Sequence, residues 1–322
     1  MPVSITVGVT TPITFLEYAK TLDQTDPTRV FVENMVAESD VMRAVPILPA
    51  SMGRRAMIDI GSLPVTGFRG LNEAGNEQTG TFNLREEDTF FIDEYIKVDR
   101  AIIDRLGRGH IYKQEKLKTI SLSQMWSQMW VKGDNSSNPR QPNGMQARCN
   151  TLNVNLLHNS VAAGGAALSL ANLDQLYWLV NKPTHWVFPR GLMAFIDIAA
   201  RNSTLTGNQF TADTDNIGRK VRRYKDLPIL FGYEPDDTPD LLPFTEVGAG
   251  GGGAVTSSIY CASFRDGGMY GIEQTPLQVI PEGLLPGTPF ESTHVKWDWG
   301  IAKEHPRACA RLTSITSATI VA

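Results

Sequence analysis

The sequence predicts an α+β protein that combines one long helix with several strands. Three observations lead to this fold class. Between Ile111 and Val131 apolar residues recur at helical spacing, whereas between His294 and Leu312 they alternate with polar residues, as in strands. The segment 54–85 is of a third kind, because it is punctuated by Gly and contains no Lys. Helical and extended patterns thus occupy separate stretches of one chain.

The overall composition is that of an ordinary globular chain. Of the 322 residues, 42% are hydrophobic and 20% charged, and the net charge of -4 with a pI near 5.8 gives no nucleic-acid footprint. No signal-peptide pattern is present, and no stretch approaches the roughly 20 apolar residues that span a bilayer, so we expect no membrane partner. Cys149, Cys261 and Cys309 follow no CxxC pattern, which argues against a disulfide framework or a zinc site. A reducing cytoplasm at the time of folding fits best.

The first fifty residues predict two short helices. Thr11-Pro12 and Asp26-Pro27 can each begin a helix, because Pro is tolerated in the first turn, and Pro46 and Pro49 then end the second one. Two short helices joined by polar turns are typical of an arm laid along a surface. An N-terminal subdomain that packs on its own chain is the alternative.

The segment from Arg54 predicts a long two-stranded ribbon. A period of two runs from Arg54 to Ile60 and ends at Gly61, and an extended pattern resumes from Thr81 to Leu84 after several Gly-containing turns. The two extended runs can pair as a hairpin. Because an isolated ribbon is marginally stable in water, we expect this one to lie on a neighbouring molecule.

A strand and a long helix follow the ribbon. Thr89 to Val98 is rich in aromatic and β-branched residues and predicts a strand. The next helix carries an apolar stripe at positions i, i+3, i+4, i+7 and i+8, which we expect to pack in the core. Its residues are Leu122, Met125, Trp126, Met129 and Trp130. Gly133 is placed to end this helix.

The rest of the chain mixes both patterns. Helical stripes fall at 173–180 and 192–200, and buried strands are expected at 186–188, 227–231 and 258–264. The C-terminal runs 294–301 and 307–312 alternate most regularly, and we expect them to form an antiparallel pair with one buried face.

No motif in the chain predicts catalysis, a cofactor or a metal site. Gly248, Gly250 and Gly253 match the spacing of a dinucleotide fingerprint, but the next element is predicted to be a strand, so a flexible loop is favoured. Cys149 with His158 could form a nucleophile and a base, yet an orienting group and an oxyanion donor are not evident. A structural cysteine is favoured.

Taken in order, these patterns resemble the major capsid proteins of tailed bacteriophages, which have the Hong Kong 97 fold. The resemblance covers the chain from about Arg54 to the C-terminus. Its sequence motifs are Phe68-Arg69-Gly70-Leu71-Asn72-Glu73 with Thr79-Gly80-Thr81, then Val131-Lys132-Gly133-Asp134 to Asn143-Gly144-Met145, then Ser257-Ser258-Ile259-Tyr260 to Gly271, and finally Val295 to Ile301 through His305-Pro306-Arg307-Ala308.

The resemblance implies a division into domains. The expected parts are an N-terminal arm (1–50), an extended loop (51–86), a peripheral domain with a long spine helix (87–145), an axial domain (146–285) and C-terminal strands that rejoin the peripheral domain (286–322). The spine helix would run from about Arg108 to Val131, and the loop from Gly248 to Gly253 would lie near the capsomer axis.

The function implied is that of a non-enzymatic shell protein. Hexamers and pentamers would close into an icosahedral capsid around double-stranded DNA, which is enclosed without sequence-specific binding. Assembly would take place in the host cytoplasm, with separate scaffold, portal and decoration proteins as possible partners, and the product would be part of the virion. The alternatives are an encapsulin-type compartment with the same fold and, more remotely, a hydrolase dependent on Cys149.

One departure from the family concerns covalent cross-linking. The founding member joins neighbours through a bond from a Lys of its extended loop to an Asn, but no Lys lies between Lys20 and Lys97 here. We therefore expect a shell without that bond, held by hydrophobic burial and by charge pairs. The charged residues expected to contact a neighbour are Arg54, Arg55, Arg69, Glu73 and Glu77.

Overall fold

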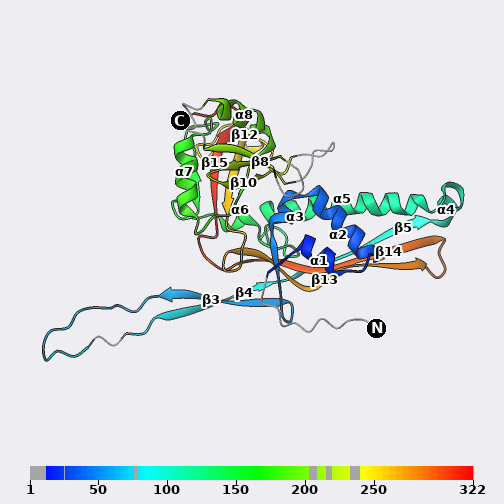
Figure 1. The fold of residues 1–322 in the computed structure, drawn as a ribbon, viewed down its shortest axis with the longest axis horizontal. Coiled ribbons are helices and arrows are strands. Elements are labelled where there is room, and N and C mark those ends of the chain that lie inside the picture. The colour runs from blue at the N-terminus through cyan, green and yellow to red at the C-terminus, as the bar shows by residue number, and fades with distance from the viewer. Residues whose placement is uncertain are drawn as a thin grey trace.

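The computed structural model describes residues 12–24, 26–75, 78–202, 209–214, 220–232 and 240–321. Figure 1 shows two bodies, each made of a sheet and helices, and a two-stranded ribbon that projects away from both. The chain enters the first body, leaves it to make the ribbon, returns, builds the second body and then crosses between the two sheets.

The first body is a five-stranded sheet with one face covered by helices. The strand order is β1-β2-β13-β14-β5. The strands are β1 (Ile13–Thr14), β2 (Pro46–Pro49), β5 (Phe90–Asp99), β13 (Met269–Leu284) and β14 (Phe290–Lys303). The expected strand after the ribbon is thus β5, and it forms one edge of this sheet. β5 leads through the short helix α4 (Arg100–Leu106) to the long helix α5 (Gly109–Lys132).

Helix α5 packs on this sheet through the predicted stripe. Leu122, Trp126 and Trp130 are buried, while Met125 and Met129 are partly buried against the same core. The indole rings of Trp126 and Trp130 stack with centroids 5.2 Å apart, and Trp126 also lies 5.5 Å from Trp299 of β14. The helix ends at Gly133, as predicted, where a Cβ atom would lie 2.4 Å from the carbonyl oxygen of Pro142.

The described part of the predicted N-terminal arm is built into this body. It forms α1 (Phe15–Thr21), α2 (Pro27–Glu38) and α3 (Asp40–Ala44). Side chains such as Phe15, Val32 and Met35 join the core beneath α5, so the prediction of an arm was wrong for these residues and packing on the same chain is what occurs. Helix α1 also begins later than expected, because Thr14 and Glu17 form a capping box.

The second body is an eight-stranded sheet with helices packed on it. Its order is β6-β15-β12-β7-β10-β9-β8, with β11 paired to β12. The strands are β6 (Leu156–His158), β7 (His185–Val187), β8 (Phe210–Thr214), β9 (Lys220–Tyr224), β10 (Leu227–Leu230), β11 (Glu246–Val247), β12 (Ala254–Ala262) and β15 (Cys309–Thr316). The helices are α6 (Met145–Arg148), α7 (Leu170–Leu179), the 3-10 turn η1 (Arg190–Leu192) and α8 (Met193–Arg201).

The C-terminal strands correct a prediction. β14 and β15 do not pair with each other, because β14 is flanked by β13 and β5 in the first sheet, whereas β15 lies between β12 and β6 in the second. The regular alternation of apolar and polar residues in these strands indicates that one face is buried. It does not indicate which strand lies beside each of them. The 16-residue β13 escaped prediction, because its register shifts near Glu273, Thr275 and Pro281 interrupt any alternation.

Candidate functional site

The projecting ribbon is the candidate site for assembly. β3 (Arg54–Ser62) pairs antiparallel with β4 (Thr81–Asp88) in a two-stranded sheet of its own, in the register Arg54↔Asp88 to Ile60↔Phe82. Nine residues of strand span about 30 Å, and the connecting segment extends further. Figure 1 shows the tip far from both bodies of its own chain. The hairpin predicted from sequence is confirmed.

The ribbon exposes apolar side chains that its own chain leaves uncovered. Phe68 and Leu71 near the tip are essentially fully exposed, at 110% and 96%. The other exposed apolar residues of the ribbon are Ile58, Leu63, Val65, Phe82 and Leu84. Exposed apolar side chains gathered on a protruding element are typical of surfaces that other molecules cover. These residues are absent from the set that the sequence predicted to contact a neighbour. The available signal was that they are apolar and lie in a segment predicted to be a ribbon without a core of its own.

Three of the five charged residues predicted to contact a neighbour have partners in their own ribbon. The guanidinium of Arg54 lies 3.2 Å from Glu86 and 2.9 Å from Asp88, and both pairs are exposed. Arg69 donates to the carbonyl oxygen of Glu73 at 2.9 Å, and the Glu73 carboxylate accepts from the amide of Gly70 at 2.8 Å. These bonds shape the tip turn. Glu77 lies outside the described residues, and contact of the other four with a neighbour stays a prediction.

Arg55 and Met57 anchor the ribbon to the first body. Arg55 donates to the Tyr270 hydroxyl at 3.1 Å and to the Pro49 carbonyl oxygen at 3.0 Å, and its guanidinium lies over the Tyr270 ring. Met57 is buried in a small core with Leu48, Ile272 and Ala302. The base of the ribbon is therefore fixed to the sheet while its tip is free of it.

A partly buried ion pair that sequence reasoning missed also holds the ribbon base. Arg148 of α6 binds Glu87 of β4 through two hydrogen bonds of 2.5 and 2.8 Å, and it donates to the Ile301 carbonyl oxygen at 2.9 Å. Nearby, a Cβ atom on Gly300 would lie 2.4 Å from the carbonyl oxygen of Asp88, so glycine lets the ribbon cross β14 closely. Glu87 and Ile301 lie 61 and 153 positions from Arg148 along the chain. No local sequence pattern could therefore have predicted that they contact it.

The Gly248 to Gly253 segment is an ordered turn in the second body. Gly251 and Gly252 have positive φ, and a Cβ atom on Gly250 would lie 2.1 Å from the carbonyl oxygen of Val161. The Ala249 amide donates to the Ser314 hydroxyl at 2.8 Å. Because the strand β12 follows this turn, as predicted, the glycine spacing does not belong to a dinucleotide site. The expected flexible loop is replaced by close backbone packing.

The proposed pairing of Cys149 with His158 does not occur. The Cys149 thiol lies 3.1 Å from Cys309, whereas His158 Nδ1 is bonded to the hydroxyl of Thr313. Burial raises the pKa of Cys149 well above its ordinary value, which disfavours the nucleophilic thiolate. This geometry contradicts a hydrolase that uses Cys149 as nucleophile and His158 as base.

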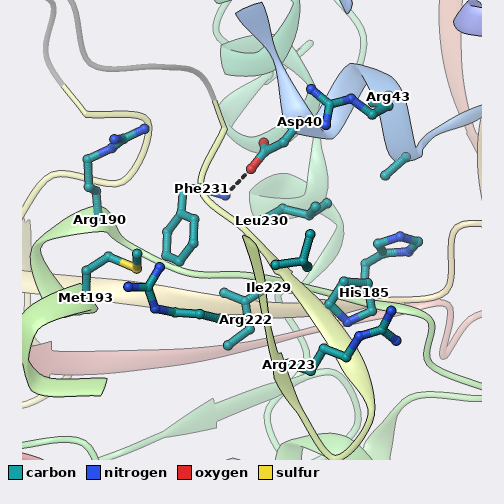
Figure 2. A pocket seen from close by; sticks show the side chains of 13 residues that line it. Asp40, Arg43, His185, Arg190, Met193, Arg222, Arg223, Ile229, Leu230 and Phe231 are labelled. Atoms are coloured by element: carbon teal, nitrogen blue, oxygen red, sulfur yellow. Dashed lines mark hydrogen bonds between the residues drawn. The ribbon is translucent and has the colours of Figure 1, made fainter. Parts of the chain in front are cut away.

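A cavity of about 430 Å³ lies where the first body meets the second. Figure 2 shows Asp40 of α3 reaching the end of β10, where its carboxylate accepts hydrogen bonds from the amides of Phe231 (2.7 Å) and Gly232 (2.8 Å). Burial raises the pKa of Asp40 to about 6, although these bonds and Arg43 act in the opposite direction. Across the cavity, burial lowers the pKa of His185 to about 4. Asp40 is therefore a titratable link between the bodies.

The raised pKa of Asp40 predicts a pH dependence of stability. Its ordinary value is 3.8, so the folded chain binds this proton more tightly than the unfolded chain. The associated stabilisation is full below that value and is lost as the pH rises through about 6. The loss is on the order of 2 to 3 kcal/mol. Urea unfolding of Asp40→Asn should show a flatter pH dependence over this range, whereas the exposed control Asp266→Asn should follow the wild type. An unchanged profile for Asp40→Asn would contradict this assignment.

Two further searches concern only the described residues. No helix among them is long and apolar enough to cross a membrane. They also contain no group of three or more His, Cys, Asp or Glu side chains arranged to hold a metal ion.

Comparison with known proteins identifies a matching family model and solved structures of similar architecture. A family model described as Major capsid protein GP7 matches residues 23–227, while no curated protein sequence matches significantly. The solved structure of the SrpI encapsulin from Synechococcus elongatus PCC 7942 is similar with a TM-score of 0.60 and 15% identity, over 95% of this chain and 96% of that one.

Two further solved structures give comparable values. The capsid of a native GTA particle has a TM-score of 0.56 at 13% identity, over 84% of this chain and 88% of the other. A structure from Mycobacterium phage Bobi has a TM-score of 0.58 at 8% identity, over 85% and 90%. These similarities confirm the predicted α+β capsid fold of the Hong Kong 97 type.

Proposed function

This chain belongs to the Major capsid protein GP7 family, and we propose that it assembles an icosahedral phage shell by laying its β3–β4 ribbon on a neighbouring subunit. Hexamers and pentamers of the chain enclose double-stranded DNA. The observation that carries the proposal is the exposed apolar surface of the ribbon, from Ile58 to Leu84. A two-stranded ribbon of this kind gains stability when a second surface covers it.

The energetics suit a contact that is modest singly and strong collectively. Burying one large apolar side chain contributes about 1.5 to 3 kcal/mol, so covering half of the ribbon's apolar residues contributes about 5 to 10 kcal/mol before the cost of association. The ribbon of one subunit meets a different surface on the next, which makes the contact heterologous and suited to closed rings. Many such contacts then stabilise the shell.

The two bodies correspond to the domains that the family implies. We assign the first body with α5 to the peripheral domain and the second to the axial domain, with the Gly248 to Gly253 turn near the capsomer axis. On this assignment the boundaries differ from those expected, because β13 and β14 pair in the sheet of the first body whereas β15 lies in the sheet of the second. The described residues before Ala50 belong to the peripheral domain instead of a separate arm.

The charge of the chain suits an enclosing role without catalysis. At a net charge of -4 the subunit confines DNA without the strong phosphate binding that would hinder packaging and release. Separate scaffold, portal and decoration proteins are the candidate partners, and assembly takes place in the host cytoplasm before the shell becomes part of the virion.

Particle composition tests this proposal. Electron microscopy of purified shells should show icosahedral particles with hexameric and pentameric capsomers, and particles from infected cells should contain nuclease-protected double-stranded DNA and a tail vertex. The alternative is an encapsulin-type compartment, whose fold covers nearly the whole chain. Closed shells that carry a protein cargo and no DNA would support that alternative and contradict the phage assignment.

The absence of Lys from the ribbon predicts a shell without Lys–Asn cross-links. No Lys lies between Lys20 and Lys97, so β3, β4 and their connection offer no amine for an isopeptide bond. Denaturing gel electrophoresis of mature particles should therefore resolve the subunit as one monomer band. A ladder of covalent oligomers that persists after reduction would contradict this prediction.

A further inference from the structure

Cys149 and Cys309 meet where the ribbon base, α6 and β15 come together. They are 160 positions apart, yet their sulfur atoms lie 3.1 Å from each other, and both are free thiols in the buried core. Cys149 directly follows Arg148, which holds the ribbon through Glu87. Cys309 is the first residue of β15. The pair thus connects the element that clamps the ribbon to the second sheet.

The surroundings of the pair shift the pKa values of the two thiols in opposite directions. The Cys149 thiol donates a hydrogen bond to Cys309, and this bond, with the positive charges of Lys303 and Arg148, lowers the pKa of Cys309. Burial keeps Cys149 in the thiol form. The Lys303 side chain is itself buried, with its ammonium 3.3 Å from the carbonyl oxygens of Arg148 and Pro306. A thiol with a lowered pKa in contact with a second thiol is the arrangement that disulfide formation requires.

We propose that Cys149 and Cys309 form an oxidation site that a small peroxide converts to an intrachain disulfide. The Cys309 thiolate attacks one peroxide oxygen and the oxygen–oxygen bond breaks, giving a sulfenic acid and hydroxide. The Cys149 thiol, on losing its proton, attacks the oxidised sulfur and expels hydroxide. The two cysteines lose two electrons in total, and hydrogen peroxide is reduced to two molecules of water.

The expected consequence is a covalent link between the end of α6 and β15 of the second sheet. A disulfide that closes a long chain segment restricts the unfolded state strongly, so the oxidised subunit should be more stable than the reduced one. Because α6 also binds Glu87 and the backbone of β14, the link would hold the ribbon base in register with β15. Disulfides form outside reducing compartments, so this site would respond to release from the cell.

Cys261 is a control within the same chain. It is buried on β12, but it lies opposite Ala310 in the ladder, whereas Cys309 lies opposite Ala262. Successive residues of a strand face opposite sides of the sheet, so Cys261 belongs to the other core. Oxidation of the pair should leave Cys261 as a thiol.

Thiol mapping of the full-length protein tests the proposal. The folded protein is treated with hydrogen peroxide, denatured, alkylated and analysed by peptide mass spectrometry. We expect alkylation at Cys261 alone, a linked peptide that contains Cys149 and Cys309, and a higher melting temperature that returns to its starting value on reduction. Cys149→Ser and Cys309→Ser should lose both effects, and Cys261→Ser should keep them. Three alkylated cysteines in the treated wild type, or a linkage through Cys261, would overturn the proposal.

The lysine beside the pair provides a kinetic test. Lys303→Gln should slow disulfide formation near neutral pH by roughly three- to fourfold for each unit by which the Cys309 pKa rises, because the lower thiolate fraction is partly offset by higher nucleophilicity. Lys296→Gln changes an exposed lysine on the same strand and should react at the wild-type rate. Equal rates for both variants would overturn the assigned role of Lys303. Should Lys303→Gln fold poorly, the pH–rate profile of the wild type decides, because it should level off below the pKa of an ordinary thiol.

Discussion

A subunit without its ribbon tip is expected to fold normally and to form no shells. The variant replaces residues 61–81 with Asn-Gly, which joins Ile60 to Phe82 in their native register through a two-residue hairpin turn. It removes Leu63, Val65, Phe68 and Leu71 but keeps the anchoring contacts of Arg55 and Met57. Because the described residues of the tip project away from both bodies, the melting temperature of the subunit should stay close to that of the wild type.

Electron microscopy and size-exclusion chromatography would measure the result. Wild-type protein should give closed particles under assembly conditions in which the shortened variant remains as free subunits or small oligomers. The double variant Phe68→Ser with Leu71→Ser should weaken assembly in the same direction without any change in chain length. Its matched control is Trp178→Ser on α7, which removes a large exposed side chain from the second body. Normal shells from the shortened variant would contradict the proposed role of the ribbon.

Truncation of Trp126 should cause the largest loss of subunit stability. Its indole is 1% exposed and packs against Phe15, Trp130 and Trp299, which come from three different elements of the first body. Trp126→Ala leaves a cavity among rings that cannot move together, so we expect a cost of about 3 to 5 kcal/mol. Since a domain of ordinary stability has about 5 to 15 kcal/mol in total, much of the subunit's stability would be lost.

Two companion variants make this prediction specific. Trp126→Phe keeps an aromatic ring in the stack and removes an indole N–H that is buried without a hydrogen-bond partner among the described residues, so it should cost much less. Trp178→Ala is the exposed control and should change stability by less than about 0.5 kcal/mol. Denaturant unfolding of the unassembled subunit measures all three. A loss below about 1 kcal/mol for Trp126→Ala would contradict the packing role of the indole.

Local periodicity carried most of the predictions that the structure confirms. The stripe from Leu122 to Trp130 predicted the position and the buried face of α5, because helical spacing places those residues on one side whatever they contact. The alternation from Arg54 to Ile60 and the extended run from Thr81 predicted the ribbon in the same way. The order of these patterns along the chain then carried the resemblance to the capsid family.

The candidate site was predictable as a segment but not as a set of contacts. Arg54, Arg69 and Glu73 were chosen because they are charged, yet the structure gives them partners within the ribbon. The exposed Phe68 and Leu71 were overlooked, because a sequence shows that a residue is apolar without showing whether a core is within reach. The ion pair of Arg148 with Glu87 depends on how α6 meets the ribbon base, which no spacing reports.

The sequence by itself determined which segments are helical, which are extended and which one lacks a core of its own, because these properties depend on residues a few positions apart. Only the tertiary structure decided that β14 and β15 enter different sheets, that the N-terminal helices pack beneath α5, and that Cys149 meets Cys309. A strand with one buried face shows the same alternation of apolar and polar residues whichever strand it pairs with. The choice among partners depends on how distant segments fill the core together, which is a property of the whole chain.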